Sequence, residues 1–153
     1  MSPRTLFRTV ALAEAVTWTL LLAGLVLKYG THTTELGVRI GGGLHGFVFL
    51  CYVTSTCFTW VNQKWSLGQG TLALAAAFVP YATIPMERAM ERRGRLDGGW
   101  RLAAGGERPQ GVLEKLQAWV LTKPVTAVVV ALAAVAVVFS VLLFLGPPGT
   151  WFS

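Results

Sequence analysis

A single carboxylic acid, Glu14, stands inside an apolar run that extends over Leu6–Leu27. An acid at membrane depth could relay protons, bind a cation or hold a substrate amine. It could also be a protonated carboxyl group that hydrogen-bonds a neighbouring helix, with Thr17 and Trp18 one turn away as structural partners. The sequence leaves both interpretations open, and we expect Glu14 to be protonated at neutral pH and hydrogen-bonded across the first two spans.

A single histidine, His45, lies in a second apolar run, Leu36–Trp60. It could shuttle protons or ligate haem, but haem ligation inside a helical bundle usually needs paired histidines, and His32 falls in a turn. A packed histidine bonded across helices is therefore favoured. If the two runs form a hairpin with its apex near residues 31–32, Glu14 lies level with a position roughly 7–8 Å from His45 along the axis. Two long side chains can bridge that distance.

The second run also contains residues that suit close helix packing. Gly42 and Gly46 form a small-xxx-small pair, which lets a neighbouring helix approach closely. The face expected to be packed holds, at helical spacing, Gly41, Gly42, His45, Phe49 and Tyr52. Near the membrane edges we expect Lys28 to act as an interfacial anchor and Arg39 to extend toward lipid phosphates.

No catalytic, cofactor-binding or metal-binding site is predicted. The sequence contains no Walker loop, HExxH motif, nucleophile elbow or paired-carboxylate motif. Cys51 and Cys57 lie on one predicted helix, roughly 9 Å apart along its axis, farther than the about 7 Å that disulfide Cα atoms usually span. Neither a metal-ligand spacing nor a CxxC motif is present. We expect both to be buried apolar thiols.

Composition indicates that the solvent of this chain is lipid. Hydrophobic residues make up 54% of the 153 residues and charged residues 13%, about half the roughly 25% typical of soluble proteins. The net charge is +6, and seven of the thirteen Lys and Arg residues lie between Arg88 and Lys115. In a membrane protein such a cluster indicates a topology signal or a contact with lipid headgroups, and no nucleic-acid partner is predicted.

Four apolar runs predict an all-α membrane protein with four transmembrane helices. The runs are Leu6–Leu27, Leu36–Trp60, Trp65–Met86 and Val125–Leu145. About 20 apolar residues are enough for a helix to cross the hydrocarbon core. The third run contains Pro80 and is expected to kink there.

The predicted helices divide the chain into three parts. Residues 1–93 form a three-span membrane module, residues 94–117 a basic, glycine-rich cytoplasmic segment, and residues 118–153 the fourth span with a short tail. The stretch from Gly98 to Gly111 is expected to be a mobile loop. Apolar residues recur at helical spacing over Val112–Val120, which predicts either a short interfacial helix or the first turns of the fourth span.

Four spans would place both termini on the same side of the membrane. Lys28, Arg39 and the seven basic residues of the long loop would then lie on one side, and Arg4, Arg8 and Lys64 on the other. Because basic residues favour the cytoplasm, this nine-to-three bias places the long loop in the cytoplasm and both termini outside.

The segment from Arg4 to Arg93 resembles a family of small bacterial integral membrane proteins of unknown function, the YdzA-like family. The resemblance is carried by an early helix with Glu14 followed by Trp-Thr-Leu-Leu and Lys28, then by a glycine-rich helix with His45-Gly46 and Tyr52, and by a third helix with a proline. It implies a three-helix membrane module and no known activity. Glu14, Lys28, His45 and Gly46 correspond to family positions of unknown role.

These observations predict a multi-pass bacterial inner-membrane protein. The leading functional hypothesis is a non-enzymatic accessory or interaction subunit of an envelope complex, with membrane lipid and either a larger complex or a homo-oligomer as partners. The second is a small proton- or cation-coupled transporter that uses Glu14 and His45. An enzyme acting on lipid or quinone is the third.

Overall fold

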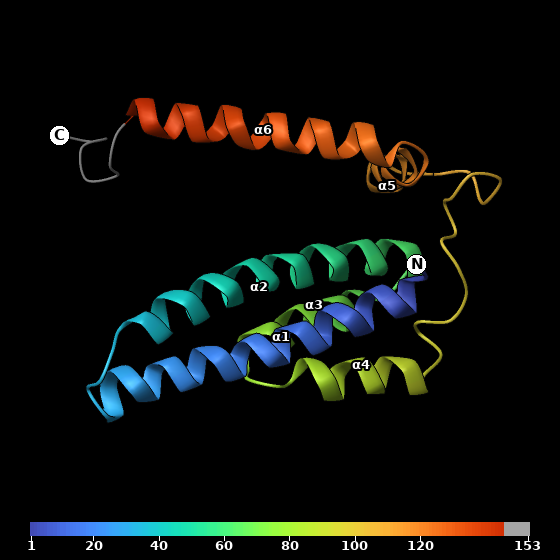
Figure 1. The fold of residues 1–153 in the computed structure, drawn as a ribbon. Coiled ribbons are helices and arrows are strands. Elements are labelled where there is room, and N and C mark those ends of the chain that lie inside the picture. The colour runs from blue at the N-terminus through green and yellow to red at the C-terminus, as the bar shows by residue number, and fades with distance from the viewer. Residues whose placement is uncertain (146–153) are drawn as a thin grey trace. The chain divides into compact units, whose positions relative to one another are not determined.

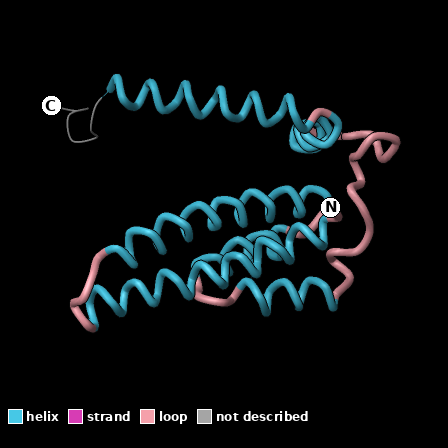
Figure 2. The backbone as a smooth tube through the Cα atoms, viewed as in Figure 1, coloured by secondary structure: helices cyan, strands magenta, loops and turns pink. Residues whose placement is uncertain are grey.

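The computed structural model describes residues 1–145, apart from some side chains of the last helix; residues 146–153 lie outside the described part. Every regular element in the described part is helical (Figure 2). The chain divides into two compact units, Met1–Arg101 and Leu102–Ser153, and we describe each by itself. The first unit extends beyond the predicted module end at residue 93. The all-helical class predicted from the sequence is confirmed.

The first unit is built on an antiparallel pair of long helices. Helix α1 (Pro3–Leu25) begins where the Ser2 hydroxyl accepts a hydrogen bond from the Thr5 N–H, and it continues into one π-helical stretch, η1 (Val26–Gly30). Helix α2 (Leu36–Gln63) runs back along α1 and ends where Lys64 takes a left-handed conformation. Each of the two helical stretches has 28 residues and is long and apolar enough to cross a membrane.

Glycines set the distance between α1 and α2. A Cβ on Gly24 would lie 2.5 Å from the carbonyl carbon of Gly37, and one on Gly41 would lie 2.8 Å from the Leu20 carbonyl oxygen. The packed small-xxx-small pair of α2 is therefore Gly37 and Gly41. The prediction that Gly46 is packed is wrong, because nothing lies within 4 Å of a Cβ built there.

Gly42 makes a weaker contact than the sequence suggested. A Cβ there would meet only Leu21 Cδ1, at 3.8 Å, which is ordinary van der Waals contact. Because one helical residue rotates the direction of the side chain by about 100°, Gly42 lies beside the contact line and Gly41 on it.

The third predicted span is not one continuous helix. Residues of Trp65–Met86 form two short helices instead: α3 (Leu67–Ala75), extended by a 3₁₀ turn, η2 (Ala76–Phe78), and the first part of α4 (Thr83–Arg92). In Figure 1, α3 runs from the end of α2 to the middle of the long pair, and α4 returns toward the end from which α3 came. Among the described residues, two helices, and not four, are long and apolar enough to be candidate spans.

The reversal has a local cause in the sequence. Pro80 restricts the preceding residue to extended geometry, and Val79 has φ −114° and ψ 122°. Tyr81 then has a φ of 65°, in the left-handed region, which turns the chain back. Pro80, which was predicted to kink a single helix, thus separates the helices α3 and α4. Pro85 is tolerated because it falls in the first turn of α4, where a backbone N–H has no helical partner.

Hydrogen bonds and ring contacts attach the turn to the long helices. Thr83 Oγ1 donates to the Ala11 carbonyl (3.0 Å), and the hydroxyl groups of Tyr81 and Thr19 lie 3.2 Å apart. The Phe78 ring lies edge-on to Phe49, with ring centroids 5.3 Å apart. The turn of this re-entrant pair is therefore held halfway along α1.

Because α4 returns, the segment after it lies at the same end of the unit as the N-terminus. Trp100 Nε1 donates to the Met1 carbonyl (2.7 Å), and Trp65 Nε1 donates to the Arg95 carbonyl (2.8 Å). The prediction that the long loop and the N-terminus lie on opposite sides is therefore wrong for the start of the loop, residues 94–101. Within Met1–Arg101, Lys28 and Arg39 lie toward the hairpin end, and the other basic residues gather at the opposite end.

The start of the segment expected to be mobile is hydrogen-bonded to α2. Asn62 Nδ2 donates to the Gly99 carbonyl (3.1 Å) and Asn62 Oδ1 accepts from the Arg101 N–H (2.8 Å). The Arg101 side chain donates in turn to the carbonyls of Val61 and Asn62 in the last turn of the helix, where carbonyl groups lack regular helical donors. Residues 99–101 thus cap α2.

The second unit contains α5 (Val112–Thr122) and α6 (Pro124–Leu145). Lys123 interrupts the helix with φ −131° and ψ 60°, and the two helices run in different directions (Figure 1). The stretch over Val112–Val120 is therefore a separate short helix and not the first turns of the next one. Helix α6 covers the predicted run Val125–Leu145; that it crosses a membrane stays a prediction.

Alanine at the glycine contacts tests the packing of α1 on α2. Gly24→Ala and Gly41→Ala each introduce a Cβ closer than 3 Å to backbone atoms, and we expect each to cost about 1–3 kcal/mol of stability. Gly46→Ala is the matched control and should be neutral or slightly stabilising, because alanine favours a helix by about 1 kcal/mol over glycine. Thermal unfolding in detergent measures the three variants. Equal losses at all three positions would contradict this contact.

Candidate functional site

The packing of α1 on α2 places Glu14 in the interior of the first unit. Glu14 is completely buried and shares its helix face with three other buried residues, Phe7, Ala11 and Thr17. These positions recur at intervals of three and four residues, so they form one stripe along α1. The stripe faces α2, because α1 and α2 make the principal helix contact of the unit.

Glu14 and His45 meet across the two helices. His45 Nδ1 lies 3.5 Å from Glu14 Oε2 and 3.2 Å from Thr17 Oγ1. The Thr17 hydroxyl also lies 3.0 Å from the Glu14 backbone carbonyl, to which it donates. With its proton used there, Thr17 Oγ1 is available as an acceptor, and the network is complete when His45 carries its proton on Nδ1. The two residues singled out from the sequence thus form one site.

The Glu14 carboxyl group itself has no hydrogen bond, so the prediction that it is hydrogen-bonded across the first two spans is wrong. Both carboxyl oxygens of Glu14 are buried without a hydrogen-bond partner among the described residues, and so is Trp18 Nε1. The Trp18 ring lies against His45, with ring centroids 4.4 Å apart. A buried ionised carboxylate without partners is very costly, so these surroundings suit the protonated acid or a bound cation. An acid–histidine pair of this kind is chemically suited to holding a proton.

Tyr52 is a structural residue in this arrangement. It is completely buried, its hydroxyl donates to the Ala73 carbonyl (3.0 Å), and its ring contacts Phe7 at 5.7 Å between centroids. The hydrogen bond satisfies the buried phenol and joins α2 to α3.

Lys28 and Arg39 lie at the hairpin end and away from Glu14. Lys28 Nζ pairs with Glu35 Oε1 (3.1 Å) and lies over the Tyr29 ring, 5.2 Å from its centroid. Arg39 is exposed. Neither contributes to the site at Glu14 and His45.

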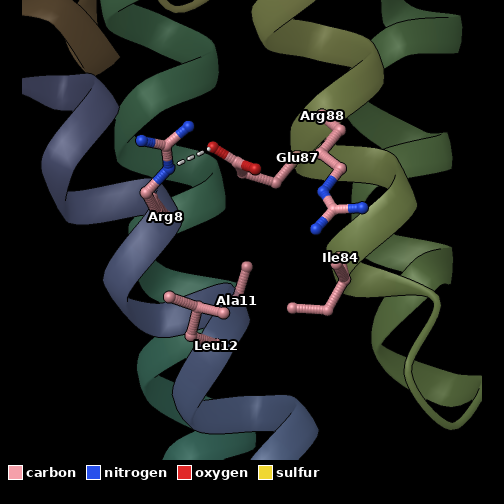
Figure 3. Close-up of a pocket in the computed structure, with 6 residues that line it drawn as sticks. All are labelled: Arg8, Ala11, Leu12, Ile84, Glu87 and Arg88. Carbon is pink, nitrogen blue, oxygen red and sulfur yellow. Dashed lines mark hydrogen bonds and ion pairs between the residues drawn. The ribbon is translucent and has the colours of Figure 1, made fainter.

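Sequence reasoning missed an ionic cluster between α1 and α4. Arg8 Nε lies 2.9 Å from Glu87 Oε1, Arg8 Nη2 lies 2.5 Å from Glu91 Oε2, and Arg4 pairs with Glu91 (Figure 3 draws the Arg8–Glu87 pair). The signal was present as spacing: the two arginines are four residues apart on one helix, and so are the two glutamates on the other. The two arginines can pair with the two glutamates only when α4 returns to the N-terminal end of α1.

The described residues contain no group of three or more His, Cys, Asp or Glu side chains that could hold a metal ion. The two cysteines are free thiols; Cys51 is half-buried, whereas Cys57 is exposed, against the expectation that both are buried.

The fold and site define a class of helical membrane module, in which two long apolar helices pack with a shorter re-entrant pair. Residues 4–92 match the family described as a domain of unknown function, DUF3817, and the chain belongs to this family. The resemblance to YdzA seen in the sequence is confirmed by the relatives.

Two relatives are similar to this chain in sequence. "Putative membrane protein SCO5905" of Streptomyces coelicolor is 50% identical over 91 residues, which are 59% of this chain and 11% of that protein. "Uncharacterized membrane protein YdzA" of Bacillus subtilis is 30% identical over 84 residues, which are 54% of this chain and 86% of that protein. The chain thus matches about a tenth of the first relative and most of the second. No solved structure was found to match the chain.

Substitutions at Glu14 test its state. Because the carboxyl oxygens make no hydrogen bonds, we expect Glu14→Gln to change the unfolding free energy by less than about 0.5 kcal/mol. Thr17→Val, which removes the contacts to His45 and to the Glu14 carbonyl, should cost about 0.6–1.7 kcal/mol, as membrane hydrogen bonds do. Detergent unfolding of both variants is the measurement. A loss of about 3–5 kcal/mol for Glu14→Gln would show instead that Glu14 and His45 form an ion pair.

Proposed function

We propose that this chain is a multi-pass protein of the bacterial inner membrane that acts as a non-enzymatic accessory or interaction subunit of a larger membrane protein. One observation carries the proposal. The module that makes up most of YdzA is only 11% of the Streptomyces coelicolor relative, where it is joined covalently to a much longer chain whose printed name is that of a membrane protein. A module that is fused in one protein and separate in another suits assembly with a larger partner.

An apolar groove between α3 and α4 supports this role. Its volume is about 350 Å³, and all its lining residues are apolar: Leu72, Ala75, Ala76, Val79, Ala82, Pro85, Met86 and Ala89. Half of them are alanines. In membranes, small residues allow the close backbone approach on which helix association depends. The groove therefore suits the side of a partner's transmembrane helix.

Site-specific photo-crosslinking in cells tests the accessory role. A photoreactive residue at Ala75, which is exposed and lines the groove, should crosslink to one larger membrane protein. The matched control is Phe47 on α2, which is 68% exposed and lies outside the groove, and it should crosslink mainly to lipid. Ala75→Trp should fill the groove and abolish co-purification in mild detergent. Crosslinks that are absent at Ala75, or equal at both positions, would refute the proposal.

A small proton- or cation-coupled transporter is the second candidate, and the Glu14–His45 pair favours it. Transporter sites often lie near the membrane midplane beside discontinuous helices. Here the turn between α3 and α4 contacts α1 at Ala11 and Thr19, on either side of Glu14. An ionisable pair and a broken helix at one depth are the elements that such a site needs.

Proton flux in reconstituted liposomes separates the two candidates. If the chain transports protons or cations, wild-type protein should dissipate an imposed pH gradient, and Glu14→Gln should reduce the rate about tenfold or more, as losing an essential proton carrier would. Glu35→Gln removes a carboxyl in the exposed hairpin turn and should leave the rate unchanged. No flux above that of empty liposomes, or equal flux in wild type and Glu14→Gln, would eliminate the transporter hypothesis.

A further inference from the structure

A cavity of about 230 Å³ lies between α1 and α4, next to the ionic cluster. Its lining residues are Arg8, Ala11, Leu12, Ile84, Glu87 and Arg88. Figure 3 shows the charged side chains at one end of the cavity and Ala11, Leu12 and Ile84 at the other. The cavity is therefore amphipathic along the helix axes, with a cationic end and an apolar end.

The charges at the cationic end do not cancel. Arg8 is paired with Glu87 and Glu91, and Arg4 adds a second cation to Glu91. Arg88 is exposed and has no ion pair in the described part of the chain. Three arginines thus face two glutamates, which leaves one positive charge. In Figure 3, the Arg88 guanidinium lies on the Ile84 side of Glu87, toward the cavity.

The position of the cavity matches the boundary between headgroups and hydrocarbon. Arg8 lies near the start of α1, at the end of the unit where Trp65 and Trp100 donate to backbone carbonyls. Tryptophans and basic residues gather at this level in membrane proteins. Leu12, one turn deeper, is 51% exposed, so the apolar end of the cavity opens toward lipid.

We propose that this cavity binds an anionic phospholipid, with the headgroup phosphate at Arg88 and Arg8 and the start of an acyl chain over Ala11, Leu12 and Ile84. A phosphodiester carries one negative charge, which matches the single uncompensated positive charge. The guanidinium donors of arginine suit phosphate oxygens. The volume is below the roughly 300–1,000 Å³ of pockets that enclose drug-sized ligands, so the site takes the phosphate and glycerol and leaves the rest of the chains in the bilayer.

Native mass spectrometry of the full-length protein tests this site. Delipidated protein in detergent is titrated with phosphatidylglycerol, and one lipid should bind. We expect Arg88→Gln to weaken binding by about tenfold, the effect of losing a charge-assisted contact. Arg93→Gln removes the same charge from an exposed residue just beyond α4, outside the cavity, and should change binding less than about twofold. Ile84→Trp should also weaken binding, because it fills the apolar end.

Three outcomes would overturn the proposal. If phosphatidylcholine binds as tightly as phosphatidylglycerol, the uncompensated positive charge of the cavity does not select an anionic lipid. Glycerol phosphate displacing the lipid at equal concentration would identify a site for free phosphate groups. Equal effects of Arg88→Gln and Arg93→Gln would show general electrostatic attraction in place of a site. Circular dichroism checks that each variant is folded, which the exposed positions Arg88 and Arg93 and the half-buried position Ile84 should tolerate.

Discussion

The approach of the α1 and α2 backbones at Gly24, Gly37 and Gly41 determines the rest of the first unit. In a membrane there is little hydrophobic drive between helices, so association depends on how closely the backbones can approach. The glycines allow one register, and this register brings His45 next to Glu14 and Tyr52 next to Phe7. The buried carboxyl is therefore a consequence of the glycine contact as much as of its own position in the chain.

The ionic cluster performs a different task from the glycine contact. Helices α3 and α4 are too short to be held by the bilayer as spans are, and their positions depend on contacts with α1 at both ends. Thr83 binds the Ala11 carbonyl at the turn, and Glu87 and Glu91 bind Arg8 at the far end of α4. The two arginines of these pairs are about half exposed, so solvent screens the pairs in part. Such ion pairs are individually weak in water, but several sharing one arginine cost less side-chain entropy than isolated pairs.

Much of the first unit could be predicted from local sequence, and the remainder could not. Hydropathy predicted α1 and α2 because composition alone decides whether a stretch of that length suits lipid. A hairpin apex near residues 31–32 was enough to bring Glu14 within reach of His45. The packed glycine pair could not be chosen, since two successive pairs, Gly37/Gly41 and Gly42/Gly46, exist on α2 and only their contacts with the α1 backbone distinguish them. Those contacts join segments that are distant in the sequence, so local sequence does not reveal them.

The re-entrant pair was missed for a related reason. Trp65–Met86 is as long and apolar as a span, and a hydropathy profile cannot distinguish a helix that crosses from two helices that turn back. The decisive information is the left-handed backbone at Tyr81 and the hydrogen bonds of the turn to α1. Had Arg4 and Arg8 been matched with Glu87 and Glu91, the charge spacing would have indicated the return.

The reversal at Pro80 has a consequence for how the protein is made. Within Met1–Arg101, everything after α2 begins and ends at one end of the long helices. If α1 and α2 cross the membrane and the N-terminus stays on the side of synthesis, only the short turn between η1 and α2, residues 31–35, has to be translocated. The re-entrant helices can enter afterwards from the side on which they are synthesised, after α1 and α2 have paired. In that orientation, the module can be appended to another membrane protein without changing the orientation of that protein's spans.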